Sequence, residues 1–151
     1  MKNIVLTLTF LIGTSAAFAQ VTERDRSMKD ILKDCQSLID DIENRNEEIV
    51  RMEFDIVKDK KETFRTLTDS YTYGITAVGD YRITKIGIEL YSEDYTDSNT
   101  WTLVKVENAD KYFASITIKP SATKRYKIVV KALKFDEDYT GGHYGLIVYH
   151  E

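Results

Sequence analysis

The spacing of apolar residues changes once along this chain, and that change limits what the chain can fold into. Between residues 22 and 46 apolar side chains recur every three or four positions, which is the spacing of one face of a helix. This stripe consists of Met28, Ile31, Leu32, Cys35, Leu38, Ile39 and Ile42. After Asn46 the spacing falls to two, as in half-buried strands. The pattern predicts one long amphipathic helix followed by a β domain.

The β part divides into about eight short segments separated by turn residues, by the reading of alternation and turn signals. The predicted strands are residues 50–56, 62–68, 71–78, 81–91, 100–107, 112–119, 124–133 and 144–149. Alternation in the fifth segment places Thr102, Val104 and Val106 on one face. Short strands at this spacing, with no helical pattern among them, predict an antiparallel β-sandwich of jelly-roll or Greek-key type. The predicted organisation has three parts: residues 1–19, an N-terminal helix at 20–46 and a β-sandwich domain at 47–151.

The first part, residues 1–19, has the features of a secretory signal peptide. Lys2 supplies the positive charge, residues 4–12 form an apolar run, and Ala17 and Ala19 mark a cleavage site before Gln20. The apolar run is shorter than the about 20 residues that cross a bilayer. No cysteine lies near the cleavage site for lipid attachment. We therefore expect a periplasmic or secreted protein without stable membrane insertion after cleavage.

The net charge and the cysteine content limit the classes of function that this chain can have. Lys2 is the only charged residue before Gln20, so the remaining chain carries 20 basic and 25 acidic residues. An acidic balance disfavours a nucleic-acid partner, which requires a basic surface to displace counterions from phosphates. Cys35 is the only cysteine, so no intramolecular disulfide can form. Its place in the apolar stripe indicates a buried residue; the alternatives are an intermolecular bridge or a reactive thiol.

The helix cannot bury its apolar stripe by itself. It packs either on the sandwich, covering a sheet face or edge, or on another chain. In the second case the helix at 22–46 is an oligomerisation surface. The sequence leaves both arrangements open, although the stripe is too short for a typical coiled coil.

The chain from about residue 62 to its end resembles the bacterial pre-peptidase C-terminal type of β-sandwich. The resemblance is carried by Tyr71–Ile75, Ile86–Tyr91 with its acidic turn, Ile116–Ser121, Tyr126–Val130 and Tyr139–Leu146. It implies a sandwich of the kind that accompanies secreted hydrolases as a non-catalytic module. The plan of signal, helix and sandwich also resembles small exported proteins of Bacteroidetes-type bacteria. Both resemblances concern fold more than chemistry.

No catalytic motif stands out, and acidic loops are the remaining candidates for chemistry. The sequence has no Gly-x-Ser-x-Gly, phosphate loop or zinc-type spacing, and its only histidines are His143 and His150. Two clusters offer the oxygen ligands that calcium prefers, although acidic turns are also commonly just solvated. The candidate calcium ligands are Glu93, Asp94, Asp97, Asn99, Asp136 and Asp138. No other cofactor is expected.

Aromatic residues in or beside the same loops indicate a binding surface. The candidate binding residues are Tyr91, Tyr95, Trp101, Tyr139 and Tyr144. Aromatic faces beside carboxylates suit a protein or glycan ligand, whereas tyrosines on half-exposed strands can also be purely structural. We therefore expect an exported, non-catalytic sandwich that binds a protein or glycan. The alternatives are an assembly protein that oligomerises through its helix, and an envelope hydrolase or calcium-dependent module that uses loop carboxylates.

Overall fold

Eight antiparallel strands follow one helix in the computed structural model, which describes residues 24–94 and 100–151. The helix α1 covers Arg24–Asn44. The strands are β1 (Glu48–Val57), β2 (Lys60–Leu67), β3 (Tyr73–Gly79), β4 (Ile83–Glu93), β5 (Trp101–Asn108), β6 (Phe113–Ile118), β7 (Lys124–Phe135) and β8 (Gly142–His150). The predicted helix and all eight predicted strands are present, with ends shifted by only a few residues.

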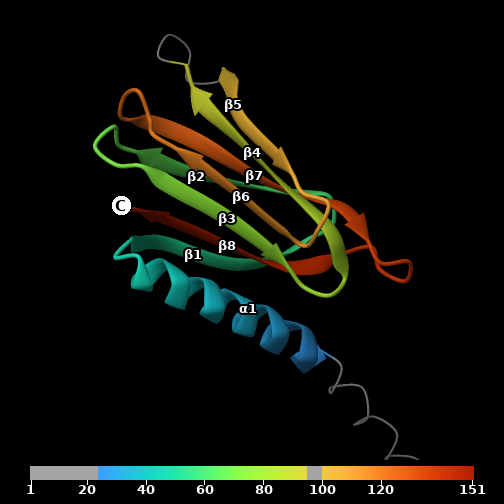
Figure 1. Cartoon of the computed structure of the whole chain (residues 1–151). Helices are drawn as coiled ribbons and strands as arrows, with labels where there is room; N and C mark the ends of the chain where they lie inside the picture. Colours follow the sequence, from blue (N-terminus) through green and yellow to red (C-terminus); the bar gives the residue numbers. More distant parts are fainter. Residues whose placement is uncertain (1–23, 95–99) are drawn as a thin grey trace, which may run out of the picture.

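The strands form two four-stranded sheets that pack face to face (Figure 1). Sheet A has the order β1-β8-β3-β6, and sheet B has the order β2-β7-β4-β5. Every pairing is antiparallel. This is the jelly-roll arrangement of eight strands in two sheets, so the predicted fold class is confirmed.

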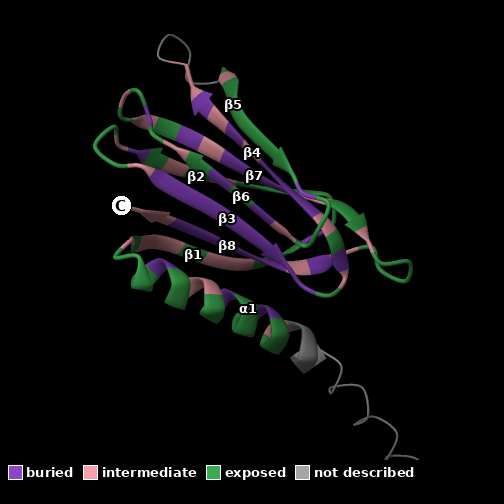
Figure 2. Cartoon of the chain, in the orientation of Figure 1, coloured by how far each residue is buried: buried purple, intermediate pink, exposed green. Residues whose placement is uncertain are grey.

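The main core lies between the sheets, where alternate residues of each strand point inward. Ile75 and Leu146 of sheet A meet Ile88, Leu90 and Ile128 of sheet B, and all five are fully buried. Strand β3 differs from the others because all seven of its residues are buried. A strand is buried on both faces only when something covers its outer side, and here that cover is α1 (Figure 2).

Helix α1 packs on the outer face of sheet A, which settles where the apolar stripe goes. Ile31, Cys35 and Ile42 are buried against Val78 and Ile147 of the sheet. Gly145 on β8 allows this close approach, because a Cβ there would lie 2.7 Å from the Cys35 sulfur. No helix in the described part of the chain is long and apolar enough to cross a membrane.

Two details of the helix differ from, or add to, the sequence pattern. Leu32, predicted in the stripe, is half-exposed, because its position falls at the edge of the contact with sheet A. The helix ends where Asn46 adopts a left-handed conformation, with a φ of 58°. The Glu47 N–H donates to the carbonyl of Ile42, so a backbone group at the helix end is satisfied as the chain turns into β1.

The predicted face of β5 is wrong at its centre. Val106 lies opposite Glu89 and Leu103 opposite Tyr91, but Thr102 lies opposite the buried Ser92. A bulge between Leu90 and Tyr91 inserts one extra residue into β5, so regular alternation breaks there. Thr102 and Val106 therefore lie on opposite faces.

Candidate functional site

The outer face of sheet B carries a group of aromatic and basic side chains that we call the sheet B face: Phe64, Tyr91, Trp101, Arg125 and Lys127. The strand register brings them together. Lys127 on β7 lies between Phe64 on β2 and Tyr91 on β4. Trp101 lies opposite Glu93, on the far side of β4 from Arg125. No helix in the described residues covers this face (Figure 1).

The rings and cations of the sheet B face contact one another closely. The Phe64 and Trp101 ring centroids lie 5.4 Å apart at 51°. The Arg125 guanidinium lies 4.6 Å from the Phe64 centroid and 5.9 Å from that of Trp101. The Lys127 ammonium lies 4.7 Å from the Tyr91 centroid and 5.3 Å from that of Trp101. Each cation therefore faces two aromatic rings, at distances where cation–π attraction is significant.

One carboxylate beside this face, Glu89 of β4, holds two polar groups in place. The Tyr91 hydroxyl donates to Glu89 at 2.7 Å, and Lys131 forms an ion pair with the same carboxylate. Burial alone raises the pKa of Glu89, but the hydrogen bonds from Lys131 and Tyr91 outweigh it and the pKa is lowered. The hydrogen bond to Glu89 in turn raises the pKa of Tyr91. Glu89 is thus a fixed anion, and the tyrosine ring has a fixed orientation.

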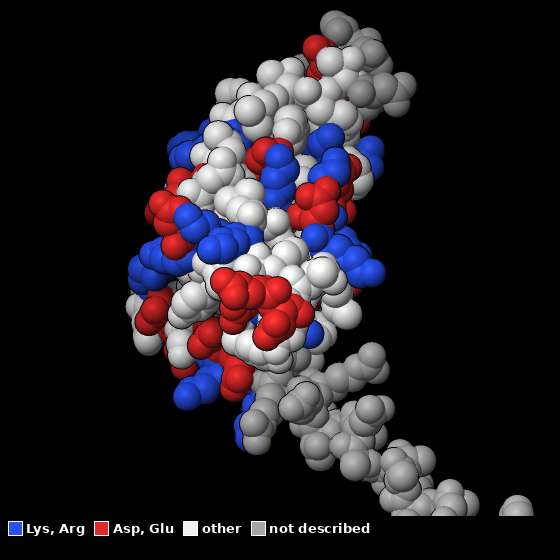
Figure 3. All heavy atoms as spheres, turned by 90° about the vertical axis from the view of Figure 1, so that its right-hand side faces the viewer, with Lys and Arg blue, Asp and Glu red and all other residues white. Residues whose placement is uncertain are grey.

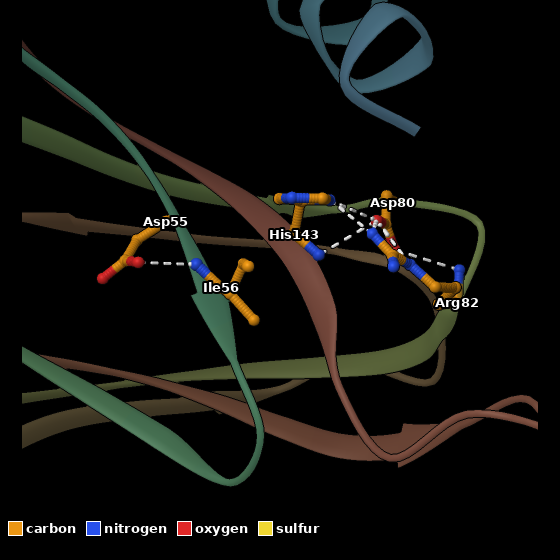
Figure 4. A network of polar contacts seen from close by, with 5 residues as sticks. All are labelled: Asp55, Ile56, Asp80, Arg82 and His143. Atoms are coloured by element: carbon orange, nitrogen blue, oxygen red, sulfur yellow. Dashed lines mark hydrogen bonds and ion pairs between the residues drawn. The ribbon is translucent and has the colours of Figure 1, made fainter. Parts of the chain in front are cut away.

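A second polar centre joins the β3–β4 turn to the start of β8 (Figure 4). The Asp80 side chain is fully buried and accepts from the Arg82 backbone N–H (3.0 Å), Arg82 Nε (2.9 Å), Arg82 Nη2 (2.5 Å) and the His143 backbone N–H (2.9 Å). His143 Nδ1 lies 3.2 Å from the same carboxylate and also contacts Arg82 Nη2. Gly142 leaves room for this contact, because a Cβ there would lie 2.8 Å from Asp80 Oδ1.

The Asp80 centre is built like a structural clamp. Both carboxylate oxygens are occupied by donors from the β3–β4 turn and from the start of β8, about sixty residues away in the chain, so they fix the end of the sandwich. Burial alone lowers the pKa of Arg82, but the hydrogen bond and charge of Asp80 outweigh it and the pKa is raised. Asp55, on neighbouring β1, stays apart from the clamp and accepts from the Ile56 N–H at 2.7 Å (Figure 4).

The single cysteine has the environment of a core residue. Cys35 is 1% exposed, and burial together with the nearby Asp34 carboxylate raises its pKa to about 11. A thiolate is the reactive form of cysteine, so this thiol is a poor nucleophile at neutral pH. Of the three interpretations of Cys35, the structure favours the buried residue.

The predicted binding residues do not form one group. Tyr91 and Trp101 belong to the sheet B face, whereas Tyr139 packs edge-to-face with Tyr81 at a ring distance of 5.7 Å. Tyr144 lies in the core, where burial raises its pKa to about 12. Tyr95 lies outside the described residues.

Sequence reasoning missed Phe64, Arg125 and Lys127. The signal for the two cations was present in β7, because Tyr126, Ile128 and Val130 point inward and their neighbours must point outward. Nothing local to β2 indicated that Phe64 would lie beside Trp101, which is 37 positions away.

The two acidic clusters do not meet in a metal site among the described residues. No group of three or more His, Cys, Asp or Glu side chains in that part of the chain is placed to hold a metal ion. Glu93 faces Arg125 at 3.7 Å, and the Asp94 N–H donates to the Thr100 carbonyl. Asp136 accepts from the Glu137 N–H within its own turn. Of the other candidate ligands, Asp138 lies in that same turn region, and Asp97 and Asn99 lie outside the described residues.

The end of the molecule where the β7–β8 loop protrudes has a surface of mixed charge. Acidic side chains gather at the middle of this face, with basic side chains around them (Figure 3). A cavity of about 510 Å³, lined in part by Asp80, lies between α1 and the β3–β4 and β5–β6 turns. Asp110, one of the carboxylates of its wall, pairs with Lys85 at 2.5 Å, and this pairing lowers the pKa of Asp110.

No protein-family model matches the sequence, and no curated protein matches it. Solved structures with a similar arrangement include a protein from Sulfurospirillum deleyianum, with a TM-score of 0.46 and 10% identity over 67% of this chain and 98% of that one. PirA has a TM-score of 0.42 and 10% identity over 66% and 93%. The pre-peptidase C-terminal domain of a collagenase from Bacillus anthracis has a TM-score of 0.42 and 16% identity over 65% and 87%. These likenesses concern β folds only and carry no functional argument.

Proposed function

We propose that this chain is an exported, non-catalytic binding protein that binds a protein partner on its sheet B face. The observation that supports this most is the gathering of aromatic and basic side chains on the one outer sheet face that α1 does not cover. Phe64 and Trp101 lie beside each other at the surface. Adjacent apolar side chains on a protein surface are typical of an interaction site.

The composition of this face favours a protein over a small molecule or a glycan. Trp, Tyr and Arg are the residues that most often dominate binding energy in protein interfaces, and the face contains all three. Leu103, Val106 and Leu133 add exposed apolar surface on the same sheet. Small ligands are bound in concave sites, whereas this group lies on an open sheet face.

Export rests on residues 1–19, which lie outside the described part of the chain. Cleavage before Gln20 is tested by expressing the full chain in a bacterial host and sequencing the N-terminus of the periplasmic or secreted product. A product that begins at Gln20 supports export. Recovery of the chain in the cytoplasm with Met1 intact would remove export from the proposal.

Trp101 is the only tryptophan of the chain, so its fluorescence reports on the sheet B face directly. The exported protein, a Phe64→Ala variant and an Arg125→Ala variant are used to capture proteins from an envelope extract. Tyr139→Ala is the matched control, because Tyr139 is an exposed aromatic residue that packs with Tyr81 instead.

We expect one partner to be captured by the wild type and by Tyr139→Ala but lost from Phe64→Ala and Arg125→Ala. The same partner, once purified, should change the emission of Trp101. A partner retained by both sheet B variants would exclude this face as the binding surface. Binding to a glycan array that is lost in the same two variants, with no captured protein, would reassign the face to a glycan.

A further inference from the structure

Strand β5 forms an open edge of sheet B and is unusually exposed. Seven of its eight residues are exposed, which makes it the most exposed strand in Figure 2. Leu103, Val104 and Val106 are 50%, 44% and 46% exposed, although all three are apolar. In the described residues, β5 pairs with β4 on one side and with no strand on the other. An apolar strand with a free edge is a template for another strand.

The other edge strand of sheet B, β2, carries more charged residues than β5 does. Half of the residues of β2 are charged, namely Lys60, Lys61, Glu62 and Arg65. Strand β5 contains only Lys105 and Glu107, which are two residues apart on the same face, and the Lys105 ammonium donates to the Thr117 carbonyl of β6 at 2.7 Å. Charged residues and bulges both protect edge strands. Strand β5 has fewer charges than β2, and its bulge leaves Val104 without a partner on β4, so the regular stretch available for pairing is residues 105–108.

The backbone of β5 shows which of its groups are free. The Ala109 N–H donates to the Ile86 carbonyl of β4 at 3.0 Å. In an antiparallel pair, alternate residues direct both backbone groups to the same neighbour. Residues 105 and 107 are four and two positions from Ala109, so their backbone N–H and carbonyl groups also point toward β4. Val106 directs its N–H and carbonyl to the open edge.

We propose that β5 pairs antiparallel with β5 of a second copy of this chain, about a two-fold axis at Val106. Charge selects this register. An axis at Lys105 would place two lysines opposite each other, and an axis at Glu107 would place two glutamates opposite each other. An axis at Val106 places Lys105 opposite Glu107 of the second copy, and the same contact occurs twice by symmetry.

The resulting dimer has one continuous eight-stranded sheet. Its two sheet B faces lie on the same side, because pairing continues the sheet through β5 and β5 of the second copy. A single pair of strands buries less surface than a standard interface, so the dimer should dissociate on dilution. The inference goes beyond the proposed function, because pairing requires no partner protein.

The test measures self-association of the exported protein by sedimentation velocity over a range of concentrations, without added ligand. Lys105→Glu and Glu107→Lys each create two like-charge pairs, and the double variant Lys105→Glu/Glu107→Lys restores two opposite-charge pairs. Lys33→Glu is the control, because Lys33 is an exposed lysine on α1 and far from β5 in the fold. Val106→Pro removes only an N–H that faces the open edge, which an edge strand tolerates.

We expect a concentration-dependent dimer for the wild type and for Lys33→Glu. Each single charge reversal should weaken the dimer by about tenfold or more, and the double reversal should restore it. Val106→Pro should be monomeric with the thermal midpoint of the wild type, which separates lost pairing from lost folding. A wild type that stays monomeric at high concentration overturns the proposal. A double reversal no better than the single ones overturns the register.

Discussion

The outer faces of the two sheets differ, although their inner faces share one core. The outer face of sheet A presents Val78, Ile147 and Gly145 to α1, with three aromatic side chains packed around this contact, and α1 covers it with Ile31, Cys35 and Ile42. The outer face of sheet B presents aromatic rings under cations, such as Trp101 near Lys127, and is left open. A glycine allows a helix to approach a sheet closely, whereas the stems of long charged side chains can themselves cover apolar surface. Aromatic rings occur on both faces, so the difference lies in Gly145, which admits α1 on sheet A, and in Arg125 and Lys127 of β7, which place charge over the rings of sheet B.

The largest effect should come from removing the covered contact of sheet A. Ile42→Ala should lower the free energy of unfolding by about 2–5 kcal/mol, because it leaves a cavity under the helix. Urea unfolding followed by circular dichroism measures this. Leu32→Ala on the exposed side of the same helix should change it by only about 0.5 kcal/mol. Equal losses for the two variants would show that α1 is not packed on sheet A.

A second prediction uses alkaline pH to test whether the contact between α1 and sheet A is shielded from water. The folded protein keeps the Cys35 proton up to a pKa of about 11, whereas the unfolded chain releases it near 9.0. The folded state therefore binds more protons between these values, so stability should fall as pH rises through that window. Tyr144, with a pKa of about 12 against 10.0, adds to the fall at higher pH.

The thermal midpoint at pH 8, 9 and 10 measures this loss. Cys35→Ala is the control, since the comparison with the wild type isolates the thiol from other groups that titrate in the same range. The wild type should lose more stability than the variant over these pH values. Parallel curves for the two proteins would mean that Cys35 is open to solvent.

Truncation of aromatic side chains on the sheet B face should affect binding of the proposed partner more than it affects the free energy of unfolding. Trp101→Ala and Phe64→Ala should each lower the free energy of unfolding by about 1 kcal/mol, because an aromatic pair contributes roughly that much beyond its buried area. Thermal unfolding measures the loss, and capture of the proposed partner measures binding. A loss as large as that of Ile42→Ala would make the sheet B face part of the core and remove the contrast between the faces.

The smallest effect should come from a cation of the open face. Lys127→Gln removes the charge near Tyr91 and Trp101 but keeps most of the side chain, and should cost about 0.5 kcal/mol. The emission maximum of Trp101 should shift in the folded protein, because a charge near its ring is lost. Lys33→Gln on α1 should leave the emission unchanged. If both variants leave it unchanged, Lys127 does not contact the ring in solution.

Most of the fold could be predicted because its signals are local. The stripe from Met28 to Ile42 and the alternation in strands such as β4 and β7 depend on neighbours within a few residues. The candidate site could be predicted only in part. Tyr91 and Trp101 were found as aromatic residues near an acidic loop, but the face that they share with Phe64 depends on how β2, β7, β4 and β5 are ordered. Tyr144 shows the opposite error, because it lies on β8 of sheet A and points into the core with Leu146 and Val148.

The sequence by itself determined the elements of this protein: one amphipathic helix, eight strands and the places where each turns. It did so because backbone conformation and one-sided burial follow from residue spacing within each segment. Only the tertiary structure decided which sheet each strand joins, that α1 covers sheet A rather than a second chain, and that Asp80 meets His143. These are contacts between residues far apart in the chain. Their partners are chosen by packing and charge in three dimensions, and no periodicity within a segment records them.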